Sequence, residues 1–209
     1  MTKNIRKDWS QLAIKFTSDQ SLIESLWNEI EKHYSSKIRH YHNLSHVSSM
    51  LNLVEEFKAT ITNYDAFLFA IWYHDIIYKP TKNNNEEKSA LFAKKRLEIL
   101  NIDEETSKTV TKLIISTKNH KVILTDNVDN SYLLDIDLSI LGTNWKTYQE
   151  YLNNIRKEYA IYPDFMYKKG RKKVLKHFLK RKTLYFTELY QTKFEKQARE
   201  NLLKELELL

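Results

Sequence analysis

The sequence predicts an all-α protein, and three observations lead to this prediction. The 209 residues include two glycines and two prolines, too few for the frequent turns of a β-sandwich or β-barrel. Apolar residues recur at helical spacing along most of the chain. The length is that of one domain with a single hydrophobic core. We therefore expect residues 1–209 to form one compact bundle of eight to ten helices.

Capping residues and apolar stripes predict the helices of the first half of the chain. They are a short helix closed by Leu12, Ile14 and Phe16, a helix from a Ser18 cap to near Tyr34, one from about Leu44, one over 66–77 behind an Asn63 cap, one from an Asn85 cap to Leu100, and one from an Asp103 cap to about Ser116. Segment 66–77 has no polar face, which predicts a buried central helix.

The second half of the chain is also predicted to be mostly helical. The expected elements are a short strand or extended connection at 122–124, a helix over 131–141 stopped by Gly142, one from Asn144 to about Tyr159, one from Asp164 to about Lys182, and one from about Thr187 to Leu209. The sequence has no internal repeat, low-complexity tract or linker, which agrees with a single domain.

The net charge of +7 is concentrated in one segment. Residues 168–182 hold nine of the 34 basic residues and no acidic one, which leaves 25 basic against 27 acidic residues elsewhere. The alternatives for this segment are a solvated helix face, a funnel for anionic substrates and a nucleic-acid contact. Because the rest of the chain is nearly neutral, we do not expect nucleic acid as a partner.

The compartment and the available metal ligands follow from composition. The chain has no cysteine, so any metal must be held by histidines and carboxylates. The longest apolar run has eight residues, far short of the roughly 20 that a membrane-spanning helix needs. The N-terminus has no apolar signal segment. We expect a soluble, cytoplasmic protein without a membrane partner.

Histidines and acids gather at three places in the first two thirds of the chain. His42 and His46 are four residues apart, but His42 precedes the expected helix start, so His46 is the safer ligand and His42 is a substrate or supporting group. The pair His74-Asp75 lies within the expected buried helix. A buried carboxylate needs a partner, which is either a divalent cation or a basic side chain.

The third place is an apolar run that contains Asp135 and Asp137. Residues two apart lie on nearly opposite sides of a helix, so only one of the two acids is expected to face a site. The other should cap or pair elsewhere.

The chain resembles the HD superfamily of metal-dependent phosphohydrolases, which have an all-helical fold. The resemblance rests on the order His46, His74-Asp75, Asp137 and covers residue 39 to the C-terminal helix. The sequence motifs that carry the resemblance are Arg39-His40-Tyr41-His42-Asn43-Leu44-Ser45-His46, Tyr73-His74-Asp75-Ile76-Ile77-Tyr78, Asn85-Glu86-Glu87-Lys88-Ser89-Ala90, Asp135-Ile136-Asp137-Leu138-Ser139-Ile140-Leu141-Gly142, Ile155-Arg156-Lys157-Glu158-Tyr159 and Gly170-Arg171.

The resemblance implies one divalent metal ion, held by His46, His74, Asp75 and Asp137, with Asp135 as the competitor of Asp137. Ligation by nitrogen and oxygen suits Mn, Fe, Co, Ni, Zn or Mg without choosing among them. The implied activity is hydrolysis of a nucleotide or another small phosphate ester by a metal-activated water.

The supporting residues each have two interpretations. Arg39 either clamps a phosphate or pairs with a helix acid. His120 and Arg171 are candidates for substrate contacts, and His120 is equally well a surface residue at a helix end. Many HD enzymes carry an acid about one turn after the His-Asp pair, where this chain has Ile77 and Tyr78. Glu86 or Glu87 is then expected to act as the acid or base.

The missing acid also favours an alternative function. In this alternative, the protein is a non-catalytic HD-fold module that binds a nucleotide or nucleic acid as a regulator. The metal ion would then be structural, and the basic segment 168–182 would contact the ligand.

Overall fold

The computed structural model describes residues 4–209 and confirms the all-α fold. These residues form ten α-helices and two short 3₁₀ helices, and no strand occurs among them. The chain divides into two compact units, an N-terminal unit of residues 1–133 and a C-terminal unit of residues 134–209. The single-domain organisation expected from the sequence stays a prediction.

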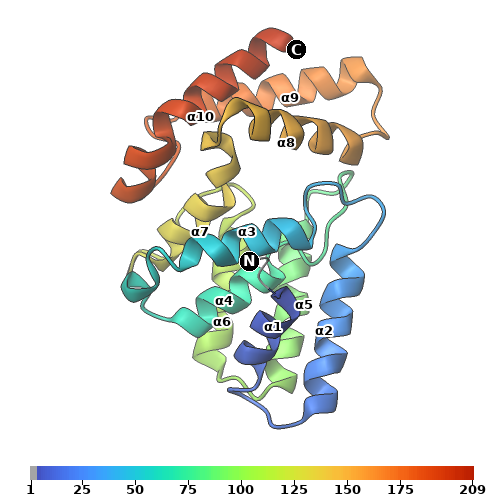
Figure 1. The fold of residues 1–209 in the computed structure, drawn as a ribbon, viewed down its shortest axis with the longest axis vertical. Helices are drawn as coiled ribbons and strands as arrows, with labels where there is room; N and C mark the ends of the chain where they lie inside the picture. Colours follow the sequence, from blue (N-terminus) through green and yellow to red (C-terminus); the bar gives the residue numbers. More distant parts are fainter. Residues whose placement is uncertain (1–3) are drawn as a thin grey trace. The chain divides into compact units, whose positions relative to one another are not determined.

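The N-terminal unit is built around one buried helix, α4 (Figure 1). Its elements are α1 (Ile5–Ala13), α2 (Gln20–Tyr34), α3 (Leu44–Val54), the 3₁₀ helix η1 (Lys58–Thr60), α4 (Tyr64–Tyr73), α5 (Asn85–Ile99), α6 (Glu104–Ser116) and the first part of α7 (Asp129–Asp137). Helix α4 contacts α3, α5 and α6, and seven of its ten residues are buried. The buried central helix predicted from segment 66–77 is thereby confirmed.

Helix caps that depend on a few neighbouring residues agree with the sequence. The Asn63 side chain accepts a hydrogen bond from the Ala66 N–H at 3.0 Å, and Asp103 caps α6 through the Thr106 N–H at 2.8 Å. Helix α3 begins at Leu44, as predicted. Asp19 caps α2 in place of the predicted Ser18.

Two predicted helix boundaries near α4 are wrong, because side chains outside the local helix turn form hydrogen bonds with the backbone. Helix α4 ends at Tyr73 instead of Ile77, where the Ile77 N–H donates to the Ser89 hydroxyl at 3.0 Å. Asn85 does not cap α5. Its side-chain amide exchanges two hydrogen bonds with the backbone of Lys79, and Asn84 takes the N-cap position.

The connection at 122–124 is extended and forms no strand. The Asn130 side chain accepts hydrogen bonds from the N–H groups of Ile123 and Leu124, at 2.8 and 3.1 Å. Asn130 is fully buried and also donates to the Ser116 hydroxyl. A side-chain amide therefore takes the place of a neighbouring strand.

The C-terminal unit contains three long helices after the end of α7. Its elements are the 3₁₀ helix η2 (Ser139–Gly142), α8 (Trp145–Glu158), α9 (Asp164–Leu179) and α10 (Glu188–Leu208). Helix α10 packs against both α9 and η2. Asn144 and Thr187 cap α8 and α10, and both helices begin where the sequence predicts.

Gly142 does not stop the preceding helix as predicted. Helix α7 ends five residues earlier, at Asp137, and Gly142 has no positive φ angle. Its role is steric, because a Cβ atom at Gly142 would lie 2.5 Å from the Cβ of Phe194 on α10. Gly170 differs completely, since a Cβ there would meet no atom within 4 Å.

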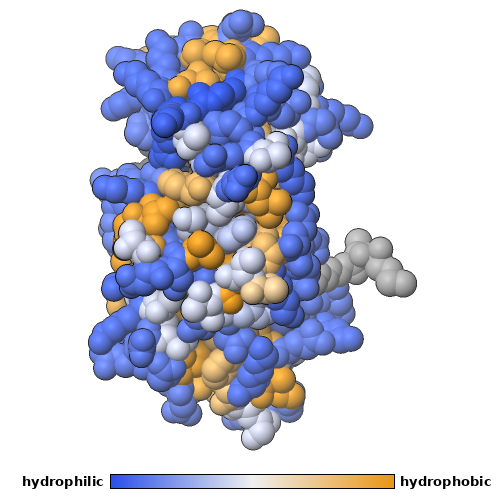
Figure 2. All heavy atoms as spheres, turned by 90° about the vertical axis from the view of Figure 1, so that its left-hand side faces the viewer, coloured by the Kyte–Doolittle hydropathy of each residue, from blue (hydrophilic) through white to orange (hydrophobic). Residues whose placement is uncertain are grey.

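The surface is mainly hydrophilic on the face drawn in Figure 2, with hydrophobic residues in separate patches. In the described part of the chain, no helix combines the length and the apolar content needed to cross a membrane.

The two glycines give opposite predictions for stability. Gly142→Ala should lower the free energy of unfolding by about 1–3 kcal/mol, because α10 has to move away from the new methyl group. Gly170→Ala should raise it by about 0.5–1 kcal/mol, because alanine is favoured over glycine inside a helix. Urea denaturation measures both. A Gly142→Ala protein as stable as the wild type would show that the approach of Phe194 does not require glycine.

Candidate metal centre

Two of the predicted metal ligands lie at the ends of helices in the N-terminal unit. The Asn43 side chain caps α3 through the Ser45 N–H, which places His46 in the first turn of that helix. His74 is the C-cap of α4, and Asp75 follows in the turn. The sequence predicted that the His-Asp pair lies within the buried helix. The structure places the pair at the end of that helix.

His46, His74 and Asp75 form a cluster that could hold a metal ion. Each offers one ligand atom, and these atoms lie within 4.8 Å of one another. The Nε2 atoms of the two histidines are 3.2 Å apart, and His74 Nε2 is 3.2 Å from a carboxylate oxygen of Asp75. The two histidines are 6% and 1% exposed, so the cluster is largely withdrawn from water.

A hydrogen bond fixes the tautomer of His74. Its Nδ1 lies 2.9 Å from the carbonyl oxygen of Ile71, which can only accept, so Nδ1 carries the proton. His74 Nε2 faces His46 Nε2 and the Asp75 carboxylate, and a proton on Nδ1 leaves Nε2 as the nitrogen that could bind a cation. Metal-bound histidines are held in the same way by a carbonyl or carboxylate behind the ring. The donor set is chemically suited to a divalent cation.

Arg39 holds the turn that carries Asp75. It is 7% exposed and donates hydrogen bonds to the carbonyl oxygens of His42, Asp75 and Ile76, at 2.8, 2.7 and 2.9 Å. These bonds take up three of the five N–H groups of the guanidinium. We therefore assign Arg39 to positioning of the His74-Asp75 turn, and its predicted contact with a phosphate stays a prediction.

Aromatic rings enclose Arg39 and continue to His42. The guanidinium carbon lies 4.9 Å from the ring centre of Tyr34 and 5.4 Å from that of Tyr78. The His42 ring stacks on Tyr78 with centroids 4.4 Å apart, and its centroid is 6.1 Å from that of His46. His42 therefore lies beside the cluster, outside α3. Its role toward a substrate stays a prediction.

Only one of the two predicted acids of α5 is partly buried. Burial raises the pKa of Glu86, and the negative charge of Asp75 raises it further. Glu87 is exposed and forms an ion pair with Lys118, whose hydrogen bond lowers the pKa of Glu87. Of the two acids, Glu86 is the one that is partly buried and influenced by the charge of Asp75, and its role as an acid or base stays a prediction.

The two acids of α7 separate as the sequence predicted for residues two apart. Asp135 is fully buried and accepts hydrogen bonds from the Phe186 N–H, the Thr187 N–H and the Thr187 hydroxyl, at 2.7, 2.8 and 2.6 Å. Burial raises its pKa to about 6 despite these bonds. Asp135 thereby holds the start of α10. Asp137 is the half-buried last residue of α7, and its role as a ligand stays a prediction.

His120 and Arg171 have identifiable structural positions. His120 adopts a left-handed backbone conformation, with φ of 45°, in the turn after α6, so it is a helix-end residue. Arg171 is 10% exposed at its side chain and forms a bidentate ion pair with Glu205, at 2.6 and 3.0 Å. That pair ties α9 to α10. Neither position tests a contact with a substrate.

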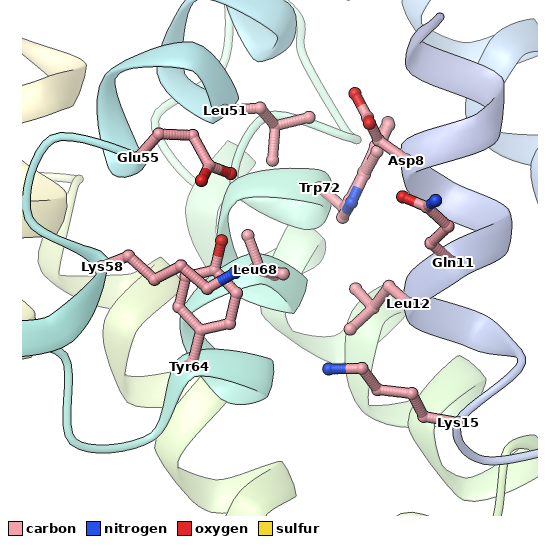
Figure 3. A pocket seen from close by; sticks show the side chains of 10 residues that line it. All are labelled: Asp8, Gln11, Leu12, Lys15, Leu51, Glu55, Lys58, Tyr64, Leu68 and Trp72. Carbon is pink, nitrogen blue, oxygen red and sulfur yellow. The ribbon is translucent and has the colours of Figure 1, made fainter.

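A cavity of the N-terminal unit, of about 190 Å³, lies between α1, α3 and α4, away from the cluster (Figure 3). No predicted site residue lines it. Two of its cations are held by neighbours: Lys15 pairs with Asp65 at 2.6 Å, and Lys58 lies 4.6 Å above the ring of Tyr64. We assign no ligand to this cavity.

Comparison with known proteins adds no further constraint. The chain matches no family model, no curated protein sequence and no solved structure. The interpretation of the cluster therefore depends on its own geometry. The sequence did not indicate Tyr34 or Tyr78 as supporting residues, because nothing in their spacing links them to Arg39.

Replacing Arg39 should damage the fold and the metal cluster together. Arg39→Met leaves three carbonyl oxygens without a donor, and we expect a loss of about 3–5 kcal/mol in unfolding free energy. Arg39→Lys should lose nearly as much, because a compact ammonium does not reproduce the planar fork whose two nitrogens reach the three carbonyls. Metal affinity should fall about 10–100-fold, as for other groups that orient ligands.

The matched control is Arg96→Met, since Arg96 in the same unit pairs with the half-exposed Glu29. It should cost at most about 1 kcal/mol. Chemical denaturation and calorimetric titration with Mn²⁺ measure both effects. If Arg39→Lys keeps full stability and full metal affinity, the positioning role of Arg39 is wrong.

Proposed function

We propose that the protein is a metal-dependent phosphohydrolase of the HD type. The observation that carries this proposal is the cluster of His46, His74 and Asp75, whose ligand atoms lie within 4.8 Å of one another, with His74 Nδ1 held by the carbonyl oxygen of Ile71. The resemblance of the sequence motifs around these residues to those of HD phosphohydrolases also supports metal-dependent hydrolysis.

A divalent cation bound to the cluster would supply a Lewis acid for a phosphoryl oxygen and would lower the pKa of a water molecule. The residues present fit such an ion, since imidazole nitrogens and carboxylate oxygens bind Mn, Fe, Co, Ni, Zn and Mg. Asp137 is the proposed fourth ligand. The engagement of both Asp135 oxygens with residues 186 and 187 supports Asp137 over Asp135.

Glu86 is the proposed proton-transfer group. Its raised pKa keeps a larger fraction of the side chain protonated than is usual for glutamate, which suits donation to a leaving oxygen. The basic segment 168–182 is proposed to attract phosphorylated substrates. We infer a nucleotide or another small phosphate ester as the substrate, and a cytoplasmic location.

The regulatory alternative keeps one specific observation in its favour. Ile77 and Tyr78 occupy the positions where many HD enzymes carry an acid, and Tyr78 stacks on His42. A module that binds its metal ion and hydrolyses no member of a broad phosphate-ester panel would support this alternative.

Metal content tests the ligand set. His46→Ala, Asp75→Ala and Asp137→Ala should each lose most of the bound metal, measured by elemental analysis of the purified protein. His177→Ala, on the exposed face of α9, is the control that should keep it. Asp135→Ala should keep the metal and lose about 2 kcal/mol of stability, because the start of α10 loses its acceptors.

Full metal content in Asp75→Ala would show that the cluster is not the metal site. Loss of metal in Asp135→Ala with retention in Asp137→Ala would exchange the roles of the two acids. Circular dichroism spectra of all five variants distinguish metal loss from unfolding.

Turnover tests the proposed activity. Chelation should abolish hydrolysis of phosphate esters, and Mn²⁺ or another divalent ion should restore it. Glu86→Gln should lower the turnover rate by about two to four orders of magnitude, the usual contribution of a general acid or base. Glu87→Gln should stay close to the wild type, because Glu87 is exposed and paired with Lys118. Hydrolysis that survives chelation or Asp75→Ala would contradict the proposal.

A further inference from the structure

Gly170 is a residue that the fold does not require. It lies in the interior of α9, where alanine stabilises a helix more than glycine does. Unlike Gly142, it has no neighbour within 4 Å of the place where a Cβ would stand. A glycine also permits a ligand to approach the helix backbone more closely than any other residue does.

Gly170 lines a cavity between α8 and α9, which we call the α8–α9 pocket. Its volume is about 300 Å³, at the lower end of the range for small-molecule sites. The wall consists mainly of aromatic and aliphatic groups. The residues that matter for the argument are Tyr159, Tyr162, Met166, Tyr167, Gly170 and Arg171. The pocket lies wholly within the C-terminal unit.

Arg156 fixes the shape of the pocket before any ligand arrives. It donates to the carbonyl oxygens of Tyr159 and Tyr162, at 3.0 and 3.1 Å, and pairs with Asp164 at 2.6 Å. Its guanidinium carbon also lies 4.8 Å from the ring centre of Tyr167. The turn between α8 and α9 and one aromatic wall are thus held together, which reduces the entropy lost on binding.

The charges around the pocket favour an anionic ligand. Arg171 is already neutralised by its ion pair with Glu205. Lys169 and Lys173 are exposed and follow Met166 and Gly170 by three residues, so each is a neighbour of a wall residue on the helix surface. No acidic residue occurs in 168–182.

We propose that the α8–α9 pocket binds a nucleoside monophosphate, with its base between the tyrosine rings and Gly170 and its phosphate on Lys169 and Lys173. Aromatic side chains stack on any base, and the bare backbone at Gly170 leaves room for a flat ring. The hydroxyl of Tyr167, like that of any tyrosine, is protonated at neutral pH and can donate to a base. The inference does not rest on the proposed hydrolysis, because binding here requires no turnover.

Calorimetric titration of the full-length protein with AMP, in the presence of EDTA, tests the proposal. Adenosine and ribose 5-phosphate each lack one half of the ligand and should bind about tenfold more weakly than AMP. Gly170→Leu should weaken AMP binding at least about tenfold by filling the pocket, while its melting temperature stays at or above that of the wild type. Lys173→Glu should weaken AMP and leave adenosine unchanged. Asp75→Ala should bind AMP like the wild type.

Four results would overturn the proposal. The first is unchanged AMP binding by Gly170→Leu, and the second is loss of binding in Asp75→Ala, which would place the ligand at the metal cluster. The third is no saturable binding of AMP, GMP, CMP or UMP up to about 10 mM, the limit of weak specific recognition. The fourth is binding of a single-stranded RNA about a hundredfold tighter than AMP, which would make this surface a nucleic-acid site.

Discussion

The contact of Arg39 with the end of α4 is the interaction on which the candidate site depends. A buried helix leaves its last carbonyl groups without partners, and such groups are costly unless a donor reaches them. Here the carbonyls of Asp75 and Ile76, just beyond the helix, accept from Arg39. Its positive charge is also favourable at the negative end of the helix dipole. A cation that belongs to the protein therefore fixes the place where the Asp75 carboxylate stands.

The carbonyl groups in the last turn of α4 also need hydrogen-bond donors, and this need explains the orientation of His74. The carbonyls of Ile71 and Trp72, in the last turn of the helix, accept from the His74 ring and from the Tyr34 hydroxyl, at 2.9 and 3.1 Å. The hydrogen bond that satisfies the helix end also sets the tautomer of the histidine. The same hydrogen bond therefore contributes to the stability of α4 and to the orientation of the His74 ring, and a change that breaks it affects both.

The sequence predicted those features that depend on nearby residues. The caps at Asn63 and Asp103 and the buried character of α4 are local, because a few adjacent side chains decide them. The end of α4 was predicted wrongly, since Ser89, twelve residues away, competes for the backbone of Ile77. The role of Arg39 could not be predicted either. A basic side chain near histidines suggests an anion site, and only the folded chain shows that Arg39 donates to three backbone carbonyl oxygens.

The two glycines show how a structure separates what a fold needs from what it tolerates. The sequence predicted that Gly142 stops a helix and that the helix from Asp164 runs through Gly170, and neither prediction involves the packing of the two residues. Packing distinguishes them, because Phe194 fills the space beside Gly142 and nothing fills the space beside Gly170. A glycine required by packing needs no further explanation. Gly170 weakens its helix although no neighbouring atom requires a glycine there. We explain its presence by the ligand proposed for the α8–α9 pocket, which Gly170 lines.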